Sequence, residues 1–166
     1  VPWLCGGRML VGPGGHLGDG HLRPHVVAGR EHRAHAAEDH DPHLVVGLGA
    51  KEGVAVINYF GLARGFLTGK YRSEADLAKS QRGGGVKQAY FNERGFRILD
   101  ALDVAAAALN ATPAQVALAW QMARPGLAAP IASATSVAQF DELAHAASLA
   151  LDAPTIESLD RASAWR

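Results

Sequence analysis

The sequence predicts an α/β fold whose strands run parallel. Two short apolar runs, over Val54–Phe60 and Leu127–Ala134, have the character of buried strands. Helical patterns with clear start signals follow each run, so the predicted order is strand, loop, two helices, strand and two helices. Because no tight hairpin joins the two strands, they are expected to lie parallel, with helices as the connections.

The first strand follows Gly53 and leads into a glycine-punctuated loop over 61–72. Residues 73–90 are polar and contain the run Gly83-Gly84-Gly85. This composition predicts a long mobile loop, and such loops in compact domains often act as lids.

The first helix is expected over about 92–109, where Phe96, Leu99, Leu102 and Ala106 recur on one face. Asn110 is expected to end it. The next helix, over 113–123, has a compact start signal, because Thr112 provides the N-cap, proline follows and Gln115 closes a capping box. Its Trp120 is assigned to the core. A glycine at 126 stops this helix before the second strand.

The last two helices are expected over 136–148 and 154–164. Ser136 and Gln139 have the spacing of a second capping box, and either Asp152 or Thr155 can cap the final helix.

The first fifty residues differ in composition from the rest of the chain. They contain seven of the eight histidines and are rich in Gly, Pro and Arg, and only 42–50 resembles a short strand. The pairs His32/His35 and His40/His43 have a spacing that can bind zinc or nickel, but no rigid frame is evident. We therefore predict no metal site, and we expect 1–50 to be disordered or translated out of frame, with one domain over 51–166.

The charge balance excludes several classes of function. Lys plus Arg equals Asp plus Glu at 16 each, so neither a nucleic-acid partner nor a polybasic membrane surface is expected. No apolar run reaches the roughly 18 residues of a membrane span. The single cysteine, Cys5, excludes an internal disulfide framework.

Three motifs occur in order along the chain. They are GVAVINYFGLARGFLTGKYR over 53–72, TPAQVALAWQMARPG over 112–126 and PIASATSVAQFDEL over 130–143. They resemble the seventh strand and its loop, the next helix, and the eighth strand with its helix in aldo/keto reductases, particularly the bacterial and potassium-channel-beta-like branch. The stretch 148–160 is similar to the family's usual ending, so the resemblance covers roughly 51–163.

The resemblance implies a (β/α)8 TIM barrel, of which this chain would be an incomplete C-terminal fragment. It also implies a cytoplasmic, NADP(H)-dependent oxidoreductase acting on an aldehyde or ketone. Family positions that contact the cofactor fall on ten residues: Tyr59, Leu62, Arg64, Gly65, Lys70, Arg82, Ser133, Thr135, Gln139 and Glu142. In the family, the aromatic ring stacks on nicotinamide, the cations and glycine meet the phosphates, and the last four hold the adenosine end.

The family's catalytic Tyr, Lys, Asp and His come from the first half of its barrel, and residues 1–50 contain no matching motif. No catalytic residue is therefore assigned, and the chain alone is expected to be inactive. Two alternatives remain open, a non-catalytic NADP-binding module and a non-functional truncated or frameshifted product. An incomplete barrel leaves open sheet edges, so self-association is also expected.

Overall fold

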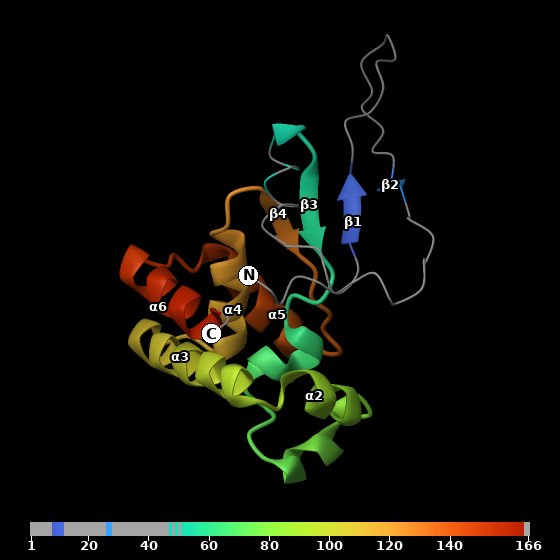
Figure 1. The fold of residues 1–166 in the computed structure, drawn as a ribbon, viewed down its shortest axis with the longest axis vertical. Coiled ribbons are helices and arrows are strands. Elements are labelled where there is room, and N and C mark those ends of the chain that lie inside the picture. The colour runs from blue at the N-terminus through green and yellow to red at the C-terminus, as the bar shows by residue number, and fades with distance from the viewer. Residues whose placement is uncertain (1–7, 12–25, 28–46, 48, 50, 165–166) are drawn as a thin grey trace.

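The computed structural model describes residues 8–11, 26–27, 47, 49 and 51–164. Its sheet has the order β2-β1-β3-β4 (Figure 1). The strands are β1 (Arg8–Val11), β2 (Val26–Val27), β3 (Ala55–Asn58) and β4 (Leu127–Pro130).

The pair β3 and β4 is parallel, as predicted, with Val56 opposite Leu127 and Asn58 opposite Pro130. Both strands are shorter than the apolar runs that predicted them. In β4 only Leu127 is buried, so the expectation of a fully buried second strand is wrong. The reason is its place in the sheet, because β4 is the terminal strand and has no neighbour on its second edge among the described residues.

The strands β1 and β2 were not predicted. β1 pairs antiparallel with β3, and β2 pairs antiparallel with β1, so the sheet is mixed rather than wholly parallel. Runs of four and two residues are too short to show a period in the sequence. Within 42–50, where a short strand was expected, the structure describes Gly47 and Gly49. Both are helical, so the prediction of a strand is wrong at these positions. The two histidine pairs and Cys5 lie outside the described residues.

Four predicted helices are present, with boundaries close to those expected (Figure 1). They are α3 (Glu93–Leu109), α4 (Pro113–Met122), α5 (Val137–His145), which continues into the 3₁₀ turn η4 (Ala146–Ser148), and α6 (Ala153–Ser163). No helix in the described part of the chain is long and apolar enough to cross a membrane.

Most of the predicted caps are confirmed. The Thr112 and Gln115 capping box is complete at α4, Asp152 caps α6 through the Thr155 amide, and Asn110 ends α3 with a left-handed φ of 48°. The second capping box is only half present. Ser136 Oγ accepts from the Gln139 amide at 3.2 Å, but the Gln139 side chain bonds elsewhere.

The prediction of a long loop over 73–90 is wrong. The segment forms the 3₁₀ turn η3 (Glu74–Lys79) and the helix α2 (Gly83–Tyr90). A Cβ atom on Gly83 would collide with the carbonyl of Leu77, so glycine here permits the close contact between α2 and η3. The glycine run that suggested flexibility is therefore a packing requirement, and the buried Val86 anchors the helix.

The main core cluster lies among α3, α4 and α6, with further buried side chains from η2 (Ala63–Thr68) and α2. Seven of the ten residues of α4 are buried, among them Trp120, which confirms its assignment to the core. Leu99 and Leu102 of α3 are fully buried on the predicted face. Arg97 of α3 also donates to the carbonyl of Ala162 in α6, which fixes α6 across α3.

Candidate functional site

A cleft of about 950 Å³ opens where β3 and β4 end. Because the two strands are parallel, the segments that follow them, 59–62 and 131–133, meet at one edge of the sheet. All ten residues that the sequence assigned to a cofactor line this single cleft: Tyr59, Leu62, Arg64, Gly65, Lys70, Arg82, Ser133, Thr135, Gln139 and Glu142. They come from segments far apart in the sequence, so the fold brings them together.

The floor of the cleft is the kinked 3₁₀ segment η2 (Ala63–Thr68). Ala63, Arg64 and Gly65 have positive φ values of 49°, 59° and 89°. For residues with a Cβ this conformation costs roughly 1–2 kcal/mol each. Such strain gathers at functional sites, where the surrounding structure enforces it.

Arg64 reaches across the cleft toward α2. Its guanidinium lies 5.3 Å from the ring centre of Phe60. It also approaches Gly85 so closely that a Cβ atom there would collide with it. Glycine at 85 therefore leaves the space that this cation occupies.

Lys70 occupies a similar position over a second glycine. Its Nζ lies 3.1 Å from where a Cβ of Gly65 would stand, and 4.9 Å from the ring centre of Tyr71. In the described part of the chain, Arg64, Lys70 and Arg82 form no ion pair, whereas Arg72 and Lys79 pair with Asp103 and Asp76. Three cations without an ion pair to a described residue therefore line the same cleft, which makes it a place for an anionic group.

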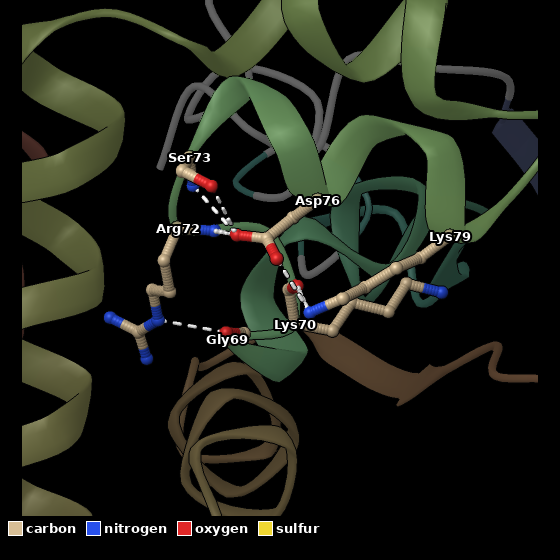
Figure 2. Close-up of polar contacts among 6 residues, drawn as sticks. All are labelled: Gly69, Lys70, Arg72, Ser73, Asp76 and Lys79. Carbon is tan, nitrogen blue, oxygen red and sulfur yellow. Dashed lines mark hydrogen bonds and ion pairs between the residues drawn. The ribbon is translucent and has the colours of Figure 1, made fainter.

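The backbone beside Lys70 is fixed by the carboxylate of Asp76 (Figure 2). One of its oxygens accepts from the amides of Arg72 and Ser73 at 2.9 and 2.8 Å, and the other pairs with Lys79 Nζ at 2.6 Å. Lys79 Nζ also donates to the carbonyl of Lys70 at 3.4 Å. The Lys79 ammonium, followed by these amides, holds the pKa of Asp76 far below its usual range.

Tyr59 begins the turn after β3 and remains 57% exposed. Its ring packs edge-on against Phe60, with 4.8 Å between ring centres. An exposed aromatic face at the rim of a cleft can stack on a planar ring of a ligand.

The opposite wall is the start of α5. Gln139 Oε1 accepts from the amide and the hydroxyl of Thr135, at 2.8 and 2.9 Å. Its Nε2 makes no hydrogen bond within the described residues, and Gln139 lines the cleft together with Ser133. The side chain of Gln115 in α4 donates to the carbonyl of Glu142 at 2.9 Å and anchors this wall.

The other two tyrosines do not line the cleft. Tyr71 is fully buried, and its hydroxyl has no partner among the described residues. Tyr90 stacks on Phe66 at 5.5 Å, and burial raises its pKa. Among the residues placed in the structure, no cluster of His, Cys, Asp or Glu could hold a metal ion.

Sequence reasoning missed three residues that shape the cleft. Gly61 and Gly85 allow close approaches, and Thr68 Oγ1 donates to the carbonyl of Gly65 at 2.9 Å to fix the kink. The glycine run at 83–85 includes Gly85 and could have indicated a close approach there, but such runs also occur in flexible loops.

Comparisons with known proteins identify the family of this chain. A sequence model of the aldo/keto reductase family matches residues 26–164. Uncharacterized oxidoreductases of Mycobacterium bovis and Mycobacterium tuberculosis are 39% identical to this chain over 118 residues, which is 67% of this chain and 34% of each relative.

The chain thus spans about a third of the length of these curated relatives. The family match includes residues 26–50, whereas the three sequence motifs lie at residue 53 or later. The family fold is a (β/α)8 barrel, and the parallel pair β3 and β4 with its helices is consistent with a part of one. With most of its length matched, the chain belongs to the aldo/keto reductase family of oxidoreductases.

Proposed function

We propose that this chain forms the NADP(H)-binding part of an aldo/keto reductase of the bacterial and potassium-channel-beta-like branch. The family reaction transfers a hydride between NADPH and an aldehyde or ketone. The observation that carries the proposal is the cleft at the ends of β3 and β4, which gathers all ten expected cofactor residues.

The residues present fit a dinucleotide. Three cations, Arg64, Lys70 and Arg82, face the cleft without an ion pair to any described residue and would neutralise the diphosphate. Gly65 and Gly85 keep the cations close to the backbone, because a Cβ at either position would displace them. The attraction between these cations and an anion raises affinity most when few carboxylates lie nearby. Among the described residues, Glu142 is the one acidic side chain that lines the cleft.

The two ends of the cleft suit the two ends of the cofactor. Tyr59 offers an aromatic face for the nicotinamide, which supplies the hydride when the cofactor is bound. Ser133 and Gln139 offer a hydroxyl and an amide donor at the start of α5, where a helix N-terminus favours a phosphate.

A non-catalytic NADP-binding module is the second candidate for the chain on its own. The observation in its favour is that Tyr59 is the one of the three tyrosines, all of them described, that lines the cleft. The family resemblance assigns this residue to stacking on the nicotinamide, not to proton donation. A carbonyl substrate would then be reduced only where the family's catalytic Tyr, Lys, Asp and His are also supplied.

The test is a fluorescence titration of the purified chain with NADPH and NADH, paired with an assay of carbonyl reduction. We expect saturable binding that favours NADPH, weakened in Lys70→Met, and no turnover. Lys51→Met, which removes an equal charge away from the cleft, is the matched control. Absence of NADPH binding would overturn the proposal, and robust turnover would overturn the proposed inactivity.

Self-association through the open sheet edge is a further part of the proposal. β4 has no partner on its second edge within the described residues, and Val137 and Phe140 of the nearby α5 are largely exposed. We expect a second copy to cover this surface, which sedimentation of the chain would reveal. Phe140→Asp should shift the chain toward the monomer.

A further inference from the structure

A buried amide on α4 clamps both ends of the turn that follows β3. Gln121 Nε2 donates to the carbonyls of Gly61 and Ala117, at 2.6 and 2.8 Å. Gln121 Oε1 accepts from Asn58 Nδ2 at 2.5 Å. Both amide side chains are buried, at 5% and 4% exposure. Tyr59 therefore lies within a short segment whose two ends are tied to one side chain.

The orientation of this network follows from its chemistry. The carbonyls of Gly61 and Ala117 can only accept, so Gln121 must turn Nε2 toward them. Its Oε1 then faces Asn58, which must present Nδ2. Asn58 Oδ1 is left buried with no partner among the described residues. An unsatisfied buried acceptor costs stability, so stability alone does not explain the pair.

The turn is also pressed against β4. A Cβ atom on Gly61 would lie 3.1 Å from the carbonyl oxygen of Ile131 and 3.2 Å from Pro130 Cβ. The ring of Tyr59 is 57% exposed and its aromatic contact is with the adjacent Phe60. Its position therefore depends on the backbone of the turn more than on packing of the ring itself.

We propose that Gln121, with Asn58, is a positioning residue for Tyr59. It holds the turn so that the aromatic face stands at the nicotinamide end of the cleft. Gln121 does not line the cleft and acts through the backbone of Gly61. This inference rests on the proposed binding of NADP(H).

The experiment compares two probes, NADPH and adenosine 2′,5′-bisphosphate, which lacks the nicotinamide. Gln121→Met keeps the length of the side chain and removes its donors. We expect it to weaken NADPH binding about tenfold, the equivalent of one or two hydrogen bonds, and to leave the bisphosphate unchanged. Tyr59→Leu should likewise weaken NADPH binding and leave binding of the bisphosphate unchanged. The double variant Gln121→Met/Tyr59→Leu should lose no more than Tyr59→Leu alone, because both changes remove one interaction.

Trp120→Phe is the matched control. It removes a hydrogen bond of 2.9 Å from Trp120 Nε1 to Asp160, on another face of the same helix. It should lower the thermal midpoint without separating the two probes. If Gln121→Met fails to fold, Asn58→Ala removes one bond of the clamp and permits the same comparison.

Equal losses for both probes in the Gln121 or Asn58 variant would overturn the inference and leave the proposed function standing. The inference also fails if Trp120→Phe separates the probes, or if the double variant loses the sum of the two effects. A wild-type chain that binds neither probe would overturn the proposed function, and this inference with it.

Discussion

Lys70 Nζ lies 3.1 Å from the position that a Cβ atom would occupy on Gly65. Any other residue at this position would therefore press its Cβ against the ammonium and force it to shift. Gly65 also has a φ of 89°, so two independent constraints require glycine here.

The first prediction is that Gly65→Ala weakens NADPH binding about tenfold and destabilises the chain. The left-handed backbone should cost roughly 1–2 kcal/mol in the free energy of unfolding. Displacement of the Lys70 ammonium should account for the loss of affinity. Lys70→Met is the control, because it should weaken binding by a similar factor with little loss of stability. Titration with NADPH and denaturant unfolding measure the two effects. Unchanged affinity in Gly65→Ala would contradict the assignment of Lys70.

The second prediction separates two neighbouring glycines of α2. A Cβ on Gly83 would collide with the Leu77 carbonyl, whereas a Cβ on Gly84 would meet nothing within 4 Å. Gly83→Ala should therefore destabilise the chain by about 1–3 kcal/mol. Gly84→Ala should stabilise it by about 0.4–1 kcal/mol, because alanine restricts the unfolded chain. Urea unfolding of the two variants checks this, and equal effects would show that α2 does not pack on η3 as described.

The third prediction concerns Tyr71, whose side chain is fully buried while its hydroxyl lacks a partner among the described residues. Tyr71→Phe removes an unsatisfied polar atom and keeps the ring. We expect the free energy of unfolding to stay the same or rise by about 1 kcal/mol. NADPH binding should be unaffected. A loss of stability beyond about 1 kcal/mol would mean that the hydroxyl has a partner.

The fourth prediction follows from the lowered pKa of Asp76, which the Lys79 ammonium and the amides of Arg72 and Ser73 depress (Figure 2). A carboxyl group with a lower pKa when folded stabilises the fold above its unfolded pKa, and that contribution is lost as pH falls toward the folded pKa. Asp76→Asn should therefore be less stable than wild type at pH 7, and the difference should shrink below about pH 4.

A second variant, Lys79→Met, tests the cause of the lowered pKa of Asp76. Lys79→Met removes the largest cause of the shift, so the stability that it loses on acidification should be smaller than in wild type, and the loss should be complete at a higher pH. Thermal unfolding between pH 2 and pH 7 measures all three chains. A constant difference between wild type and Asp76→Asn across that range would contradict the role of the carboxylate.

The helices were largely predictable because their signals are local. Thr112 with Gln115 marks the start of α4 by its own hydrogen bonds, and Asn110 ends α3 by its own conformation. The ten residues expected to contact a cofactor came from family motifs, and the fold places them on one cleft because β3 and β4 are parallel. Their role in binding stays a prediction.

What could not be predicted depends on contacts between distant segments. Gly83 looked like part of a flexible loop, since its contact with Leu77 is visible only in three dimensions. The clamp of Gln121 on Asn58 joins residues 63 positions apart, and no local pattern indicates it. Gln139 matched the spacing of a capping box, but its side chain reaches Thr135 instead of the Ser136 amide.

The last prediction uses this arrangement of Gln139. Its Oε1 accepts from the amide and hydroxyl of Thr135, whereas its Nε2 makes no hydrogen bond to a described residue. Gln139→Glu keeps the acceptor and favours the helix start, because a carboxylate suits the N-terminal turn. It also replaces the amide donor with a negative charge.

The adenosine 2′-phosphate of NADPH should therefore bind about tenfold more weakly to Gln139→Glu, whereas NADH, which lacks that phosphate, should bind as before. Titration with both cofactors at low and high salt measures the difference between the two losses of affinity. High salt should reduce this difference, because it screens the repulsion between the carboxylate and the phosphate. Asp141→Asn, which changes a charge on the same helix away from the cleft, should leave the ratio unchanged. Equal binding of NADPH to Gln139→Glu and wild type would place the 2′-phosphate away from the start of α5.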